Sequence, residues 1–176
     1  MKRLVCFAML LAGCGAATTN SSPSSSDGTG VIGITAAESA RAPSEPLQFR
    51  LLSGEAWAAP AGKVLVVDIW ASYCKPCRKG FPKLDALVAA HPDIALLAVS
   101  VDEQDAAAKQ FLTEVPTKVT IGRASADWMM GAPLKLQSVP SLLVFDKQGR
   151  ERFRASEAFD ADYDKLPAIV QQLLAE

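Results

Sequence analysis

The sequence predicts an α/β sandwich in which helices flank a mixed central β-sheet. Two near-continuous apolar runs, 64–70 and 94–101, are typical of strands that are buried on both faces. Segments in which apolar residues recur at helical spacing alternate with these runs, and the polar stretch 146–149 reads as a hairpin loop between two further strands. Strands and helices that alternate and then end in a hairpin indicate both parallel and antiparallel pairs in one sheet.

The elements follow one another along residues 45–176, which we expect to form the folded domain. The expected strands cover 47–52, 64–70, 94–101, 119–121, 141–145 and 151–155. The expected helices cover 74–90, 106–112, part of 125–135, and 160–175. We expect Pro82 to kink the first helix because it has no N–H to donate. Asp102 or Asp105 is the expected N-terminal cap of the second helix.

The first residues have the pattern of an export signal. Lys2 and Arg3 precede the apolar stretch 4–11, which is much shorter than the roughly 20 residues that span a bilayer as a helix. Residues 11–14 read Leu-Ala-Gly-Cys and resemble the lipobox of bacterial lipoproteins. The resemblance implies cleavage after residue 13 and acyl chains on Cys14, which would anchor the protein to a membrane. The alternative is an ordinary secretory leader in which Cys14 is incidental.

The segment 14–44 differs in composition from the expected domain. It is rich in Ser, Thr, Ala, Gly and Pro, and it has too little apolar surface to offset its chain entropy. We expect a flexible tether with a span of about 30 Å. The predicted organisation is therefore a lipoprotein signal peptide at 1–13, a lipidated tether at 14–44 and one domain at 45–176.

Composition argues against several classes of function. The formal net charge of −1 at pH 7 argues against a nucleic-acid-binding protein, which would usually be strongly basic. Of the four cysteines, Cys6 lies in the expected leader and Cys14 is the expected lipidation site. Cys74 and Cys77 therefore remain as one pair in a compartment where disulfides can form. A closed zinc site takes four ligands, and His91 is the one histidine of the chain.

The pair of cysteines carries the main chemical signal. It follows the apolar strand that ends at Trp70 and opens a helix, so free backbone N–H groups and the helix dipole stabilise a thiolate at Cys74. Lys75 adds a positive charge, and Pro76 fits an early helical position because an N–H there would have no partner. We expect Cys74 to be the nucleophile and Cys77 to be the resolving thiol.

The string from Trp70 to Arg78, which reads Trp-Ala-Ser-Tyr-Cys-Lys-Pro-Cys-Arg, resembles the active site of the thioredoxin superfamily. With the lipobox, the chain is similar to membrane-anchored thioredoxin-like proteins of the TlpA/ResA type. Val139-Pro140-Ser141 and the strand after it resemble the cis-proline segment of that family. The resemblance implies that Pro140 is cis and faces the two sulfurs. It also implies that the Val139 backbone pairs with an extended substrate and that Trp70 shields the disulfide.

Two positions set this chain apart from the membrane-anchored group. Members of the group commonly carry a Glu two residues before Pro82, where this chain has Gly80, and often have Asn where it has Asp68. We hypothesise that Asp68 is buried near the strand end with a raised pKa and accepts the proton of Cys77 during resolution. The alternative is that Asp68 only satisfies a buried hydrogen bond.

The expected substrate-binding residues surround the two cysteines. They are Trp70, Tyr73, Lys75, Pro76 and Val139. For Trp70, the alternative is packing at the end of the strand. Tyr73 is placed on the exposed rim of the site.

The resulting hypothesis is a lipid-anchored thiol–disulfide oxidoreductase that faces the periplasm and reduces disulfides of exported proteins, such as apocytochrome c in family members. It needs no cofactor beyond the Cys74–Cys77 disulfide, and the resemblance implies a membrane electron donor that reduces it again. We expect a monomer in the bacterial cell envelope, and Gly15 after Cys14 favours the outer membrane. The alternatives are a disulfide oxidase or isomerase, a non-catalytic binding module and a metallochaperone.

Overall fold

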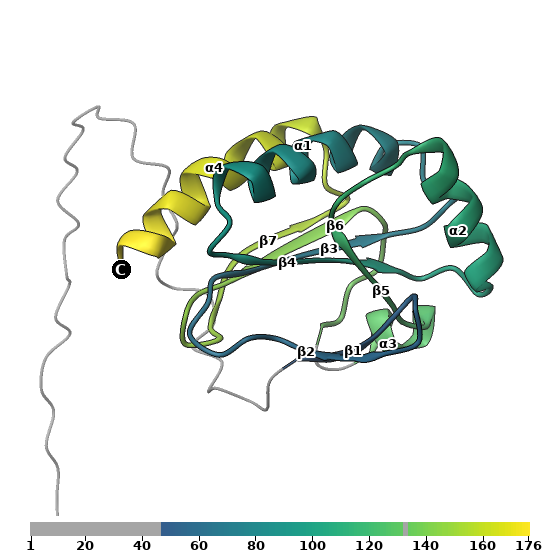
Figure 1. Cartoon of the computed structure of the whole chain (residues 1–176), viewed down its shortest axis with the longest axis horizontal. Coiled ribbons are helices and arrows are strands. Elements are labelled where there is room, and N and C mark those ends of the chain that lie inside the picture. The colour runs from purple at the N-terminus through teal and green to yellow at the C-terminus, as the bar shows by residue number, and fades with distance from the viewer. Residues whose placement is uncertain (1–46, 132–133) are drawn as a thin grey trace, which may run out of the picture. The chain divides into compact units, whose positions relative to one another are not determined.

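The computed structural model describes residues 47–131 and 134–176. The predicted leader at 1–13, the lipidated Cys14 and the tether at 14–44 lie outside the described residues. A mixed seven-stranded sheet, in the order β2-β1-β5-β4-β3-β6-β7, forms the centre of the domain (Figure 1). The predicted α/β sandwich is confirmed.

The central strand β3 is paired on both sides. The strands are β1 (Gln48–Leu51), β2 (Ala56–Ala58), β3 (Leu65–Trp70), β4 (Ala95–Ser100), β5 (Thr120–Arg123), β6 (Ser141–Phe145) and β7 (Glu151–Ser156). β3 pairs in parallel with β4 and antiparallel with β6, and every residue of β3 and β4 is buried. This burial explains the two apolar runs. The sequence does not predict β2, because a three-residue edge strand with two exposed residues carries no apolar pattern.

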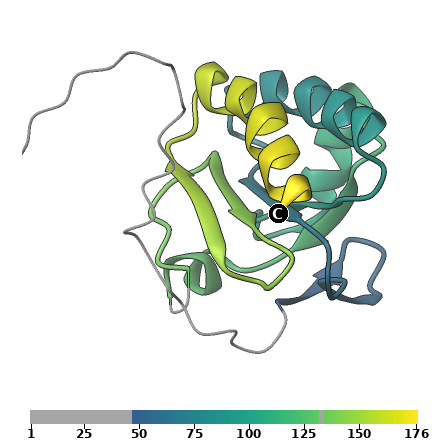
Figure 2. The ribbon, with the colours of Figure 1, turned by 90° about the vertical axis from the view of Figure 1, so that its left-hand side faces the viewer.

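Two long helices lie side by side across one face of the sheet, as Figures 1 and 2 both show. They are α1 (Cys77–Ala90) and α4 (Asp160–Ala175). The shorter helices are α2 (Asp105–Glu114) and α3 (Ala126–Met130). α1 is continuous through Pro82. None of the helices in the described part of the chain is long and apolar enough to cross a bilayer.

The start of α1 differs from the prediction. Cys74 lies in the turn before the helix, and the first helical residue is Cys77. The reason is that Pro76 takes the N-cap position, where its carbonyl accepts a hydrogen bond from the Lys79 N–H at 3.0 Å. The Cys74 N–H instead donates to the carbonyl of Ala71 at 3.0 Å, which closes a separate turn after β3.

The predicted caps of α2 are wrong. The N-cap residue is Gln104, and its side chain makes no capping hydrogen bond. Asp105 lies inside the first turn and forms an ion pair with Arg123 at 2.9 Å. The carboxylate of Asp102 is occupied elsewhere, because it accepts hydrogen bonds from Ser72 and Ser100.

Candidate active site

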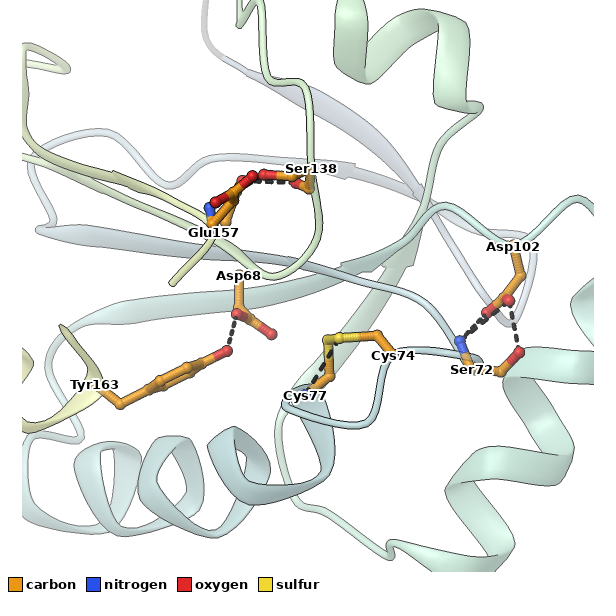
Figure 3. Close-up of a disulfide and its surroundings, with 9 residues drawn as sticks. Asp68, Ser72, Cys74, Cys77, Asp102, Ser138, Glu157 and Tyr163 are labelled. Atoms are coloured by element: carbon orange, nitrogen blue, oxygen red, sulfur yellow. Dashed lines mark hydrogen bonds between the residues drawn. A yellow bond between two sulfur atoms is a disulfide. The ribbon is translucent and has the colours of Figure 1, made fainter. Parts of the chain in front are cut away.

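The two predicted sulfurs form a disulfide between the end of β3 and the start of α1 (Figure 3). The Cα atoms of Cys74 and Cys77 are 5.4 Å apart. Cys74 is 5% exposed and Cys77 is 1% exposed, so Cys74 is the more accessible of the two residues. The backbone N–H of Cys77 donates to the Cys74 sulfur at 3.2 Å. When the disulfide opens, this N–H at the helix N-terminus is positioned to stabilise a thiolate on Cys74.

A buried carboxylate holds the turn that carries Cys74. Asp102, just beyond β4, accepts the Ser72 N–H with both oxygens at 3.0 and 3.1 Å and accepts the Ser72 hydroxyl at 2.7 Å. The hydroxyl of Ser100 donates to the same carboxylate at 2.8 Å. Figure 3 shows Ser72 and Asp102 on the Cys74 side of the disulfide. The sequence does not reveal this contact, because its partners are thirty positions apart and belong to different strand ends.

Pro140 lies at the same end of the sheet as the disulfide. The Val139–Pro140 peptide bond is cis, which confirms that implication of the resemblance. Ser141, the next residue, begins β6 and is paired with Ile69 of β3, one position before Trp70. The Pro140 carbonyl accepts the Ala158 N–H at 2.8 Å. That Pro140 faces the sulfurs and that Val139 pairs with a substrate both stay predictions.

Asp68 is a buried acid in the middle layer of the fold. It is 1% exposed, and its neighbours across the sheet are Ala98 of β4 and Leu142 of β6. The Tyr163 hydroxyl donates to Asp68 Oδ1 at 2.8 Å. Burial raises the pKa of the Asp68 carboxyl to about 7, and the hydrogen bond from Tyr163 opposes that rise. The expected burial and raised pKa are confirmed.

Sequence reasoning missed Tyr163. It lies on α4 with Leu166, Val170 and Leu173, all of them buried at helical spacing. That pattern predicts a core residue, and Tyr163 is indeed buried. Its polar partner lies 95 positions earlier in the chain, so no local signal announces the hydrogen bond. Burial and the adjacent Asp68 carboxylate hold the pKa of the Tyr163 hydroxyl far above its usual range, so it stays protonated.

Trp70 does not lie on the substrate surface, which corrects its predicted placement. Its side chain is fully buried and packs against two phenylalanines. The ring centroids are 5.1 Å from Phe81 of α1 and 4.7 Å from Phe111 of α2. The strand-end packing alternative therefore describes Trp70, because its ring lies in the core against α1 and α2.

The outer surface around Cys74 carries an exposed aromatic residue and a shallow pocket. Tyr73 is 73% exposed, as expected for the rim, and Phe159, before α4, is 65% exposed. A pocket of about 390 Å³ lies beside the active-site turn. It is lined by Lys75, Pro76, Lys79, Phe159, Asp160 and Ala161. The sequence predicts Lys75 and Pro76 as part of this surface. It gives no reason to select Phe159, the N-cap residue of α4, which also lines the pocket.

Metal-binding residues do not gather in the described ranges 47–131 and 134–176, where no three His, Cys, Asp or Glu side chains could share an ion. His91 caps the C-terminus of α1, and its backbone N–H donates to the Leu87 carbonyl at 2.9 Å. The groups that the fold does bring together, as Figure 3 shows, are the two sulfurs, the Asp68 carboxyl and the Tyr163 hydroxyl. Such a set can open and close a disulfide and can move one proton while it does so.

Comparison with known proteins gives a consistent result. Residues 62–151, about half of the chain, match a protein-family model described as thioredoxin-like. The thiol:disulfide interchange protein DsbE of Pseudomonas aeruginosa is 28% identical over 117 residues, which cover 65% of this chain and 64% of that protein. The thiol-disulfide oxidoreductase ResA of Bacillus thuringiensis is 25% identical over 91 residues, or 51% of this chain and 52% of that protein.

Among solved structures, DsbF of MTB has a TM-score of 0.64 at 21% identity and covers 73% of this chain and 95% of that chain. This likeness concerns the fold. The two curated relatives are longer than the matched region, and the chain spans between about half and just under two thirds of their length.

Because the Asp68 carboxyl is buried, we expect the free energy of unfolding to fall as the pH rises. In the unfolded chain Asp68 has its ordinary pKa of 3.8, and folding raises it to about 7. The folded state therefore holds the extra proton, and its stabilising contribution is complete below pH 4 and is lost as the pH rises through 7. Between these two limits the contribution of Asp68 to the free energy of unfolding changes by roughly 4 kcal/mol. The free energy of unfolding of the oxidised protein, measured with urea between pH 4 and 8, should show this fall in the wild type. Asp68→Asn should lack it, because asparagine stays neutral. An equal fall in both proteins contradicts the assignment.

Proposed function

This chain belongs to the thioredoxin-like family, and on that premise we propose that it is a thiol–disulfide oxidoreductase that works through Cys74 and Cys77. The observation that carries the proposal is the disulfide between β3 and α1, with the Cys77 N–H on the Cys74 sulfur. The names of the curated relatives, thiol:disulfide interchange protein and thiol-disulfide oxidoreductase, support the same class of reaction.

Two exchange steps account for the reaction. In the reduced protein the Cys74 thiolate attacks one sulfur of a substrate disulfide, forms a mixed disulfide and releases the other substrate sulfur as a thiolate. Cys77 then attacks the Cys74 sulfur, which closes the internal disulfide and releases the second substrate thiolate. The greater exposure of Cys74 and its contact with the Cys77 N–H support this division of roles.

Asp68 is proposed as the base of the second step. Cys77 must lose its proton before it attacks, and a carboxylate with a pKa near 7 can accept that proton at neutral pH. Figure 3 shows Asp68 between Tyr163 and the sulfur pair, with one carboxyl oxygen directed toward the disulfide. The proton returns to solvent after the disulfide has closed.

The substrate is proposed to bind across the outer face of the turn. Tyr73, Lys75 and Pro76 lie on this face, and the pocket extends it to Phe159. Val139, before the cis bond, offers backbone groups for an extended peptide. An unfolded or flexible protein segment that contains a disulfide fits such a surface, because it can present both backbone and apolar side chains.

The direction of the reaction is proposed to be reduction of disulfides in exported proteins, as in cytochrome c maturation. Oxidases of this fold usually carry an inserted helical domain, whereas the described residues between β4 and β6 form only α2, β5 and the five-residue α3. A reductant is used up in each cycle, so a membrane electron donor that reduces Cys74–Cys77 again is part of the proposal. The protein is proposed to act as a monomer.

We propose that Cys14 carries the lipid that holds the domain at the periplasmic side of the cell envelope. The lipobox-like Leu-Ala-Gly-Cys at 11–14 supports this. Labelled palmitate should enter the wild-type chain in a bacterial host, and Cys14→Ser should abolish labelling and release the protein from membranes. Equal labelling of both chains contradicts the assignment, and the Cys6→Ser chain serves as the matched control.

Insulin reduction tests the activity. With dithiothreitol as electron source, the wild-type chain should accelerate insulin precipitation, and Cys74→Ser should remove the acceleration because no thiolate attacks the substrate. Cys77→Ser should accumulate a mixed disulfide that a non-reducing gel detects. Turnover that survives Cys74→Ser contradicts the proposal. The direction is checked by the reduction potential of the pair in glutathione buffers, which we expect to be about −270 mV. A value of about −120 mV indicates an oxidase instead.

The pH dependence of resolution tests Asp68. The rate at which Cys77 resolves a mixed disulfide on Cys74 should rise with pH to a plateau, with a midpoint near 7, because only the Asp68 carboxylate accepts the proton. Asp68→Asn should resolve slowly at pH 7 and recover only at alkaline pH, where Cys77 loses its proton without the help of a carboxylate. Stopped-flow release of the second thionitrobenzoate from Ellman's reagent reports this step. An unchanged profile between about pH 6 and 9 contradicts the role.

A further inference from the structure

We propose that Tyr163 is a positioning residue of this site, which orients the Asp68 carboxyl for its reaction with Cys77, and that Gly80 is required so that the Tyr163 ring can stand there. The inference rests on the proposed function. It assigns a role to a buried hydroxyl of α4 and to a glycine of α1, neither of which touches the substrate.

The first support is the hydrogen bond itself. The Tyr163 hydroxyl donates to Asp68 Oδ1 at 2.8 Å, and both side chains are buried. A donor that occupies Oδ1 fixes the rotation of the carboxyl group and leaves Oδ2 to accept a proton. In Figure 3 the Tyr163 hydroxyl approaches Asp68 from the side away from the disulfide. The free oxygen is therefore the one directed toward the sulfurs.

The second support is the absence of space at Gly80. A Cβ atom added to Gly80 would lie 2.5, 2.6 and 2.7 Å from Cζ, Cε1 and Oη of Tyr163, closer than Cβ atoms approach other heavy atoms. The clash involves the ring carbons as well as the hydroxyl, so the whole ring would have to move. A side chain at position 80, such as the Glu of similar proteins, would therefore displace the Tyr163 ring from its present position. Gly80 and Tyr163 thus form one structural unit between α1 and α4.

The third support is the surroundings of the carboxyl. Its sheet neighbours, Ala98 on β4 and Leu142 on β6, are apolar. Figure 3 shows the disulfide of Cys74 and Cys77 on the side of Asp68 away from Tyr163. α4 brings Tyr163, and the acids at its start, Asp160 and Asp162, act on the tyrosine and raise its pKa further. Within the described residues, the Tyr163 hydroxyl is the one side-chain donor that contacts Asp68.

Burial and the hydrogen bond from Tyr163 have opposite effects on the pKa of Asp68. Burial favours the neutral acid, and a hydrogen-bond donor favours the carboxylate. Tyr163 therefore keeps more of Asp68 in the basic form at neutral pH than burial alone would allow. During resolution the proton passes from the Cys77 sulfur to Asp68, the Cys77 thiolate bonds to the Cys74 sulfur, and the substrate sulfur leaves with its electron pair. Tyr163 keeps its own proton throughout.

Tyr163→Phe in the full-length chain tests the proposal, because phenylalanine keeps the ring and removes only the donor. We expect the midpoint of the resolution profile, measured with Ellman's reagent, to rise by about one pH unit. Resolution at pH 7 should then be about fivefold slower, while the plateau at high pH stays the same. In the Asp68→Asn background the same substitution should produce no shift. Gly80→Ala should raise the midpoint and add nothing further to Tyr163→Phe.

Two controls separate this role from a structural one. Ile169→Val shortens another buried side chain of α4, and it should leave the midpoint unchanged. The titration of the Asp68 carboxyl, followed by carbon NMR in the oxidised chain, should shift upward in Tyr163→Phe without any redox reaction. If the midpoint and the NMR titration both stay where they are in the wild type, the proposal is overturned. If the titration shifts but no chain releases thionitrobenzoate, the proposed function fails and the positioning of Asp68 by Tyr163 stands.

Discussion

The candidate site depends on the burial of β3 between two hydrogen-bonded neighbours. β4 on one side and β6 on the other leave no free edge along this strand, so its end is a rigid point in the fold. The turn that carries Cys74 leaves from that end and is tied to β4 by Asp102. Pro140 stands at the start of β6 beside the same end. Groups from three separate parts of the chain thus meet because they share one strand.

The same burial sets the pKa of Asp68. A carboxyl enclosed by apolar neighbours keeps its proton to a higher pH than it would in water, and in the proposed mechanism Asp68 therefore acts as a base near neutral pH. An unpartnered buried carboxylate would be strongly destabilising, and the Tyr163 hydroxyl moderates this penalty. The helix pair α1 and α4 carries the two residues that make this contact possible, Gly80 and Tyr163.

Much of this arrangement could be predicted from local patterns. The buried strands β3 and β4, the hairpin of β6 and β7 and the helix α4 have strong periodicity or turn signals, and the structure has them with small changes at their ends. The start of α1 was harder to predict, because Pro76 is compatible with either the first turn or the cap position. Trp70 was harder still, because a residue at a strand end can face either the core or the surface. Its packing on Phe81 and Phe111 depends on helices that are distant in sequence.

The sequence by itself determined the class of fold and the pair of sulfurs, since these depend on residue types and short spacings. The resemblance to the thioredoxin superfamily singled out Asp68 and the proline before β6. The tertiary structure alone decided which partners these residues meet. Asp102 meets Ser72, and Tyr163 meets Asp68 across a separation of 95 positions. Hydrogen bonds of this kind leave no periodic trace, because they depend on how α4 packs over the sheet. The absence of a side chain at Gly80 became meaningful only when the ring that fills its space was seen.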